Sequence, residues 1–184
     1  MADLGPLHAA TRDLHHSIEQ TPFGKSMASG DVDPQEWTIW LRSLYDIHYM
    51  IDNWAPDALK RADEVKQDLL EMYKRGYYAS HIDSVRLYLD SIKAEEQALG
   101  AIYVLGGAHV MGGAIIQRQI NGKLPCSHLT YPDDTRRNAV AAVKSLRDRN
   151  ELSEHARDCF KILITIANHI EERTKTFNAR QIYP

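Results

Sequence analysis

The chain has 184 residues, of which 43% are hydrophobic and 26% charged, a balance typical of a globular protein with one domain over residues 1–184. The net charge of -3 gives no electrostatic reason to expect binding to nucleic acid or to a membrane surface. We find neither eighteen consecutive apolar residues nor a signal peptide, so we expect a cytoplasmic protein without a membrane span. The only two cysteines, Cys126 and Cys159, are expected to be buried or incidental thiols.

The first predicted helix starts at Asp3 or at Gly5-Pro6 and ends near Thr21-Pro22, because proline disfavours helical geometry in the residue before it. Its apolar face is formed by residues at helical spacing, namely Leu7, Ala10 or Thr11, Leu14 and Ile18. His15 lies beside this face, and Glu19 follows four residues later, so the two side chains are neighbours one turn apart. Such a carboxylate can orient an imidazole and leave its other nitrogen free for a metal, although ordinary solvated pairs share this spacing.

The second predicted helix starts at Asp33-Pro34-Gln35-Glu36, which combines a capping side chain, proline at the first position and glutamate at the third. It carries a continuous stripe at spacings of three and four, formed by Trp37, Trp40, Leu41, Leu44, Tyr45, His48 and Ile51. A break is expected around 53–56. Further helices are predicted over 58–73, 83–99, 135–148 and 153–177, with loops at 121–125 and 130–134. Strand patterns are almost absent, so we predict an all-α multi-helix bundle.

The segment 102–120 is apolar but is interrupted by four glycines within eight positions, Gly106, Gly107, Gly112 and Gly113. Each glycine in a helix interior costs about 1 kcal/mol relative to alanine, so the cluster needs a reason. A backbone without side chains can approach something flat and bulky. Close packing between helices, or a helix that ends and restarts, would explain the same glycines. The cluster is not a phosphate-binding loop, since no strand precedes it and no lysine follows at the required place.

These two features together resemble the heme oxygenases. The residues of the first helix that carry the likeness to the family's proximal helix are Leu7, Ala10, Thr11, His15, Glu19 and Phe23. The likeness continues through Gly30 and Ser43-Leu44-Tyr45 to His48. The segment 99–113 is similar to the glycine-rich distal helix of the bacterial enzymes, mainly at its start and at its closing Gly-Gly. The resemblance implies a heme oxygenase-like bundle that holds heme between the first helix and the glycine-rich helix.

The resemblance also implies an activity and a set of site residues. Heme b would be both substrate and cofactor, cleaved with O2 and electrons from a ferredoxin or a reductase to biliverdin, carbon monoxide and ferrous iron. His15 would be the proximal iron ligand, supported by Glu19, with His16 as its competitor about a hundred degrees further around the helix. The heme would lie against Gly112 and Gly113. Its propionates would pair with cationic side chains, for which the candidates are Arg12, Arg136, Arg137 and Lys144.

The chain departs from the family pattern in the distal segment. Between Leu105 and the closing Gly-Gly it is longer, so we expect a displaced helix kink. The animal-type enzymes carry an aspartate just after the first distal glycine, where this chain has Gly107 or Ala108. The predicted catalytic residues are therefore Gly106, Gly107, His109 and His48, with either histidine able to hold catalytic water. His48 could instead be a hydrogen-bonded core residue, and His109 could be an outward-facing or merely packed side chain.

Other classes of protein remain open at this point. A non-catalytic heme carrier or sensor would bind iron between His15 and His109. A di-iron enzyme would need several paired Asp/Glu-x-x-His motifs, whereas Asp13-x-x-His16 stands alone. A thiamin-degrading enzyme would need a catalytic cysteine in a polar cleft, and neither cysteine has a recognisable partner. A plain helical interaction module would leave the glycine cluster unexplained.

Overall fold

The computed structural model describes residues 5–182, with side chains through Lys175. Its α-helices are α1 (Pro6–Gln20), α2 (Pro22–Ser29), α3 (Pro34–Ile51), α4 (Ala62–Lys74), α5 (Asp83–Ser91), α6 (Glu95–Gly107), α7 (Gly113–Ile120), α8 (Asp133–Arg147) and α9 (Ser153–Ile182). Three short 3-10 turns are η1 (Asp57–Leu59), η3 (Ser127–Leu129) and η4 (Asn150–Leu152), and η2 (Ala108–Gly112) is a π-helix. Residues 5–182 contain no strand, which confirms the all-α prediction.

The first helix begins at Pro6 and ends at Gln20, as predicted, while Asp3 lies outside the described residues. Helix α2, which begins at Pro22 directly after α1, was not predicted from the sequence. Thr21 is extended and its side chain accepts a hydrogen bond from the Gly24 amide at 3.0 Å, so it caps the new helix. Pro22 was interpreted only as a stop for α1, but proline is equally favourable at the first position of a helix.

Among the other predicted helices, one start is confirmed and two predictions differ from the structure. The start at Asp33 is confirmed, since its side chain accepts from the Gln35 and Glu36 amides. The single helix predicted over 83–99 is wrong, because α5 ends at Ser91 and α6 begins at Glu95. The Gln97 side chain accepts a hydrogen bond from the Ala94 amide at 2.9 Å, which fixes the new helix start. The helix predicted from residue 58 begins with η1, and α4 follows at Ala62.

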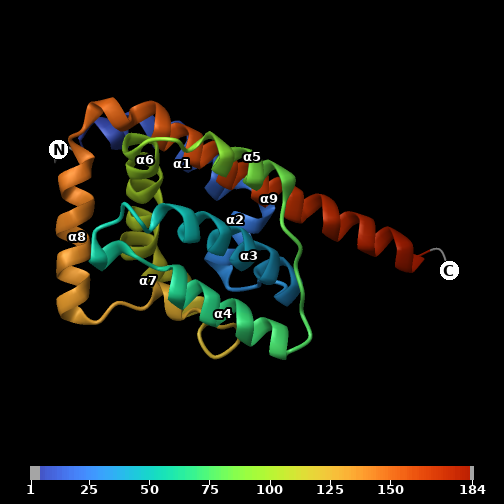
Figure 1. The fold of residues 1–184 in the computed structure, drawn as a ribbon. Helices are drawn as coiled ribbons and strands as arrows, with labels where there is room; N and C mark the ends of the chain where they lie inside the picture. Colours follow the sequence, from blue (N-terminus) through green and yellow to red (C-terminus); the bar gives the residue numbers. More distant parts are fainter. Residues whose placement is uncertain (1–4, 183–184) are drawn as a thin grey trace.

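The long helix α9 organises the bundle (Figure 1). Helices α1 and α6 pack along it, α8 lies beside α6, and α4 packs on α3. Helix α6 continues through η2 into α7 as one column that crosses α9. A Cβ added to Gly100 would lie 2.5 Å from the Cβ of His155, so only glycine permits this close crossing of α6 and α9.

Among the described residues, one helix has the length and the apolar composition to span a membrane. It is the column Glu95–Ile120, with a mean hydropathy of 1.7. Of its most apolar window, 56% is buried inside the protein. The buried residues of α6 include Leu99, Ile102 and Leu105, which pack in the core against neighbouring helices. Partial burial of this kind is typical of a core helix in a globular protein.

Candidate functional site

Helix α1 presents His15 and Glu19 on its exposed face. His15 Nδ1 lies 3.5 Å from Glu19 Oε1, which is the contact that the spacing predicted. The imidazole also packs edge-to-face against Phe160 of α9, with ring centroids 5.8 Å apart. The side chain of His15 is 59% exposed, and its Nε2 has no hydrogen-bond partner among the described residues. The ring is therefore oriented at one nitrogen and open to a ligand at the other.

The neighbouring candidates on α1 lack such an arrangement. His16 and Arg12 are both exposed, and neither has an interaction partner within residues 5–182. Of the two adjacent histidines, it is thus His15 that faces the Glu19 carboxylate. Arg12 remains on the same helix as His15 with its guanidinium free to pair with an anion.

Between α6 and α7, the five residues of η2 form a π-helix, whose wider i to i+5 turn accommodates more residues than an α-helical turn. It occupies the stretch in which the sequence is longer than the family pattern. The two faces of this stretch differ in polarity and burial. Ala108, Met111 and Ile115 are exposed, with Met111 61% and Ile115 59% accessible. His109 and Val110 are buried on the other side. The exposed face is apolar and has no cover from the described residues.

The four clustered glycines have separate roles. A Cβ at Gly106 would lie 3.2 Å from Leu59, and one at Gly113 would lie 3.1 Å from Leu129, so both permit close helix packing. A Cβ at Gly107 would be at an ordinary 3.8 Å from Val143. At Gly112 a Cβ would meet nothing within 4 Å. Gly112 is therefore the glycine of the four that leaves open space for a ligand.

His48 of α3, His109 of η2 and His128 of η3 come together in the interior, and we refer to these three residues as the histidine cluster. The rings of His48 and His109 stack with centroids 5.3 Å apart, and His128 meets His109 edge-on, also at 5.3 Å. Each outer ring is held by a carboxylate. His48 Nδ1 lies 3.0 Å from Asp52 Oδ1, and His128 Nδ1 lies 2.6 Å from Asp68 Oδ2. In the neutral ring this leaves Nε2 as an acceptor.

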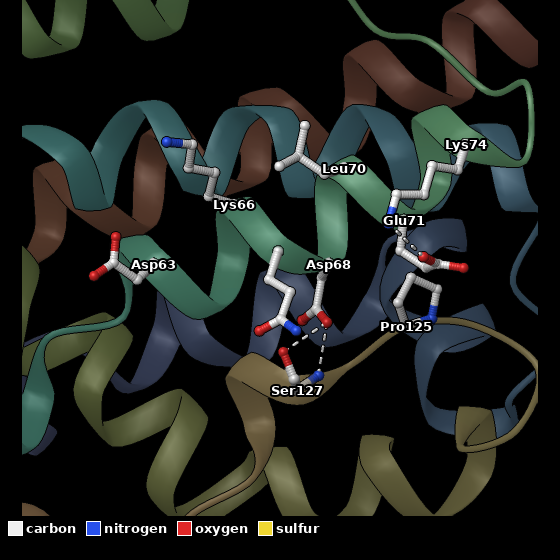
Figure 2. Close-up of a pocket in the computed structure, with 9 residues that line it drawn as sticks. Asp63, Lys66, Asp68, Leu70, Glu71, Lys74, Pro125 and Ser127 are labelled. Atoms are coloured by element: carbon white, nitrogen blue, oxygen red, sulfur yellow. Dashed lines mark hydrogen bonds and ion pairs between the residues drawn. The ribbon is translucent and has the colours of Figure 1, made fainter.

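Of the carboxylates that hold the histidine cluster, Asp68 accepts the most hydrogen bonds. It accepts hydrogen bonds from the Ser127 amide at 2.9 Å and hydroxyl at 2.7 Å (Figure 2), and from the His128 amide at 3.0 Å. Burial alone would raise the pKa of Asp68, but the hydrogen bonds and the charge interaction with His128 leave it lowered. Burial lowers the pKa of His128 despite the opposing effect of Asp68. We therefore describe Asp68 as an ionised carboxylate that holds the His128 ring at Nδ1.

His109 has no such carboxylate. Burial lowers its pKa well below the ordinary 6.5, and His48, His128 and Arg61 lower it further. Its Nδ1 is buried without a hydrogen-bond partner among the described residues, and so is His48 Nε2. His109 is thus a neutral imidazole that points into the interior, away from the exposed face of Met111. This placement gives no support to iron ligation by His109.

The predicted cationic residues of α8 are only partly brought to the site. Arg136 donates to the Val110 carbonyl of η2 at 3.5 Å, which ties α8 to the π-helix. Arg136 and Arg137, with Asp133 and Val140, line a cavity of about 590 Å³. Lys144 lies exposed further along the helix. Arg136 is therefore the candidate with a direct contact to the distal segment.

The structure also bears on two other classes of protein, the di-iron enzymes and the thiamin-degrading enzymes. No group of three His, Cys, Asp or Glu side chains within the described residues is arranged to hold a metal ion, so a di-iron centre is not supported. Both cysteines are free and buried, as expected. Burial raises the pKa of the Cys159 thiol to about 12, and it also raises that of Cys126, which does not suit a catalytic nucleophile.

Sequence reasoning missed most partners of the histidine cluster. Asp52 follows His48 by four residues, the same spacing as His15 and Glu19, so this pair could have been found. His128 and Asp68 are sixty residues apart, and no local pattern connects them. Arg61, which is buried and stacks on the Tyr131 ring 3.6 Å from its centroid, lies in a connecting segment between helices.

The structure thus combines an all-α bundle, an exposed histidine held by a carboxylate on the first helix, and a glycine-rich column. No family model matches the sequence, and no curated protein is similar to it. Among solved structures, heme oxygenase-1 from the cyanobacterium Synechocystis, in complex with heme, matches with a TM-score of 0.67 and 18% identity over 96% of both chains. Heme oxygenase from Leptospira interrogans matches with a TM-score of 0.71 and 15% identity over 89% of this chain and 97% of that one. The chain has the heme oxygenase fold.

Proposed function

We propose that the protein binds heme between α1 and the exposed face of η2 and α7, with His15 as the proximal iron ligand. The observation that carries this proposal is the His15–Glu19 pair, which holds Nδ1 and leaves Nε2 free. It lies on the first helix of a fold shared with a heme complex. A neutral imidazole with its second nitrogen bonded to a carboxylate is a common arrangement for a metal-ligating histidine.

The other side chains of the proposed site suit a porphyrin. Met111 and Ile115 offer an apolar surface for the flat ring and would exclude water from it. Gly112 adds no side chain in the space above that surface. The propionates are carboxylates, for which guanidinium groups are well-matched partners, and Arg12, Arg136 and Arg137 are the candidates.

We further propose that heme is the substrate of an oxidative cleavage to biliverdin, carbon monoxide and ferrous iron. When bound, heme supplies both the redox-active iron and the ring that is cleaved, while O2 and electrons from a ferredoxin or a reductase are external. The protein holds the iron through His15 and keeps the imidazole oriented through Glu19. A neutral imidazole pushes less electron density toward the iron than a thiolate would, which favours attack on the ring over cleavage of the oxygen–oxygen bond.

The test is to add ferric heme to the purified protein and to record its absorption spectrum before and after supplying O2 with ascorbate or a ferredoxin system. We expect a high-spin or water-ligated complex that converts to biliverdin, lost in His15→Ala and retained in the matched variant His16→Ala. A stable low-spin complex that depends on His109 and yields no bilin would favour the carrier or sensor. Absence of heme binding would overturn both, leaving a likeness of fold alone.

A further inference from the structure

The π-helix η2 connects two environments that differ completely. Ala108 and Met111 on its outer face are exposed and form part of the proposed heme site. His109 on its inner face is 6% exposed and belongs to the histidine cluster. Since His109 and Met111 are only two residues apart, the ring of His109 cannot leave the cluster without moving the backbone that carries Met111.

The groups that surround His109 are neutral or positively charged on every packed element. His48 approaches from α3 and His128 from η3, both with ring centroids at 5.3 Å. Arg61, from the segment before α4, contributes an unfavourable charge interaction with a protonated His109. From α8, Arg136 donates to the Val110 carbonyl. A proton on His109 would therefore add a positive charge that Arg61 disfavours.

The nearby carboxylates do not compensate, because each is bonded to other groups. Asp52 accepts from His48 Nδ1 and, at 2.7 Å each, from the Arg61 and Ala62 amides. Asp68 is bonded to Ser127 and His128, and Glu64 pairs with Arg61 at 2.9 Å. Consequently the interior accepts His109 only as a neutral ring.

The segment that would have to move is suited to rearrangement. A π-helical turn is less favourable than an α-helical one and persists only where the packing holds it. Here it is flanked by Gly107 on one side and ends in Gly112-Gly113 on the other. Around Gly112 there is open space, since an added Cβ would meet nothing within 4 Å. At Gly112, therefore, no neighbouring side chain obstructs a shift of the backbone.

We propose that protonation of His109 expels its ring from the histidine cluster and rearranges η2, so that the ligand site on the outer face of η2 loses affinity in acid. The identity of that ligand as heme rests on the proposed function, whereas the protonation and the rearrangement do not. Expelled into water, His109 takes up its proton with the ordinary pKa of 6.5. Below that pH the equilibrium shifts toward the expelled form by about tenfold per pH unit. The apparent Kd of the ligand rises as the competent fraction falls.

The first experiment uses the heme-free protein. Amide hydrogen exchange across residues 107–114, expressed as protection relative to the unstructured chain, is measured at pH 7.5 and pH 5.5. We expect protection of this segment to fall about tenfold in acid, as the uptake of a single proton allows, while that of α9 is retained. The variant His109→Phe, which keeps an aromatic ring without a titrating group, should hold its protection at both values. The control His81→Gln removes a histidine that is 70% exposed and should behave like the wild type.

The second experiment measures the affinity for heme at the same two pH values. Because an imidazole binds iron only in its deprotonated form, we expect some acid loss of affinity in every variant, and the test is the difference between variants. We expect the acid loss in the wild type to exceed that in His109→Phe by about tenfold, in line with one additional proton. If His109→Phe fails to fold, the uncharged His109→Gln replaces it.

Equal protection of residues 107–114 at both pH values in the wild type would overturn the inference without any variant. An acid loss of heme affinity that is the same in His109→Phe as in the wild type would also overturn it, while leaving the proposed function intact. If the wild type does not bind heme at pH 7.5, the proposed function fails, and the heme-free exchange still decides whether His109 controls η2.

Discussion

Within the described residues, four carboxylate–histidine pairs share the same contact at Nδ1 but differ in burial, and one of them joins the exposed His81 to the largely buried Asp46 at 2.9 Å. The pair of His15 and Glu19 is exposed and separated by 3.5 Å. The buried pairs are shorter, at 3.0 Å for His48 with Asp52 and 2.6 Å for His128 with Asp68. An exposed pair contributes little to stability, whereas a buried one is costly to break. Of the four, His15 with Glu19 is the pair in which both side chains are exposed, so it is the pair most open to a ligand.

The substitution Glu19→Gln tests that distinction. Loss of the carboxylate should weaken heme affinity by about tenfold, because the imidazole loses the group that fixes its orientation and raises its basicity. The free energy of unfolding should change by less than about 0.5 kcal/mol, since the pair is exposed. Heme titration and urea unfolding measure the two quantities, with His16→Ala as the control. An unchanged heme affinity would argue against His15 as the iron ligand.

Asp68→Ala should behave in the opposite way. It removes the acceptor of four hydrogen bonds from Ser127 and His128 and leaves those donors buried. We expect a loss of about 3–5 kcal/mol in the free energy of unfolding, measured with urea. Asp63, which lines the same surface pocket of about 320 Å³ (Figure 2), provides the matched control. Asp63→Ala should cost no more than about 1 kcal/mol, and similar losses for both would contradict the role of Asp68.

At the scale of single elements, the sequence predicts helices well where the signals are local. Asp33 and Pro34 mark the start of α3, and the four-residue spacing pairs His15 with Glu19. The same local reasoning interprets Pro22 as a stop and so misses α2, because one residue both ends a helix and begins the next. The glycine cluster signals an irregularity, but the side chains that pack on these glycines, Leu59, Leu129 and Val143, come from distant segments.

The glycines of the column make a matched pair of predictions. Gly112 has an ordinary helical backbone, with φ of -86°, and open space around it, so Gly112→Ala should stabilise the heme-free protein by about 0.5–1 kcal/mol. A Cβ at Gly100 would lie 2.5 Å from His155 and 2.8 Å from the Ala156 amide nitrogen, so Gly100→Ala should destabilise it by about 1–3 kcal/mol. Thermal unfolding distinguishes the two. Destabilisation by Gly112→Ala would show that η2 cannot accept any side chain there.

At the scale of the whole molecule, the sequence predicts the all-α bundle but not the histidine cluster at its centre. Helical periodicity is a property of neighbours in the chain, so it survives without knowledge of packing. The contact of His128 with Asp68 joins residues sixty positions apart, and Arg61 and Tyr131 meet across more of the chain. Such contacts follow from the packing of α3, α4 and η3 and have no signature in one sequence.

The cluster should also make global stability depend on pH. The pKa values of His109 and His128 are lowered in the folded protein, so below their ordinary value of 6.5 the unfolded chain binds protons that the folded protein does not. Stability should therefore be constant just above pH 6.5 and fall on acidification, by at most about 1.4 kcal/mol per pH unit for each histidine. Urea midpoints at pH 7.5, 6.5 and 5.5 measure this. A smaller acid loss is expected for His109→Phe, and a midpoint that rises toward pH 5.5 would contradict the account.

The close crossing at Gly100 has a mechanical consequence for the column that contains it. Near Gly100, the backbone of α6 is pressed against His155 and Ala156 of α9, so this end is clamped. Twelve residues further along, the backbone at Gly112 touches no neighbour within reach of a Cβ. The column is thus held where Gly100 crosses α9 and again where Gly113 packs on Leu129, and between these two points its backbone is open at Gly112. If a bulky ligand displaced Met111, the backbone near Gly112 would bend, and the crossing of α6 with α9 would stay in place.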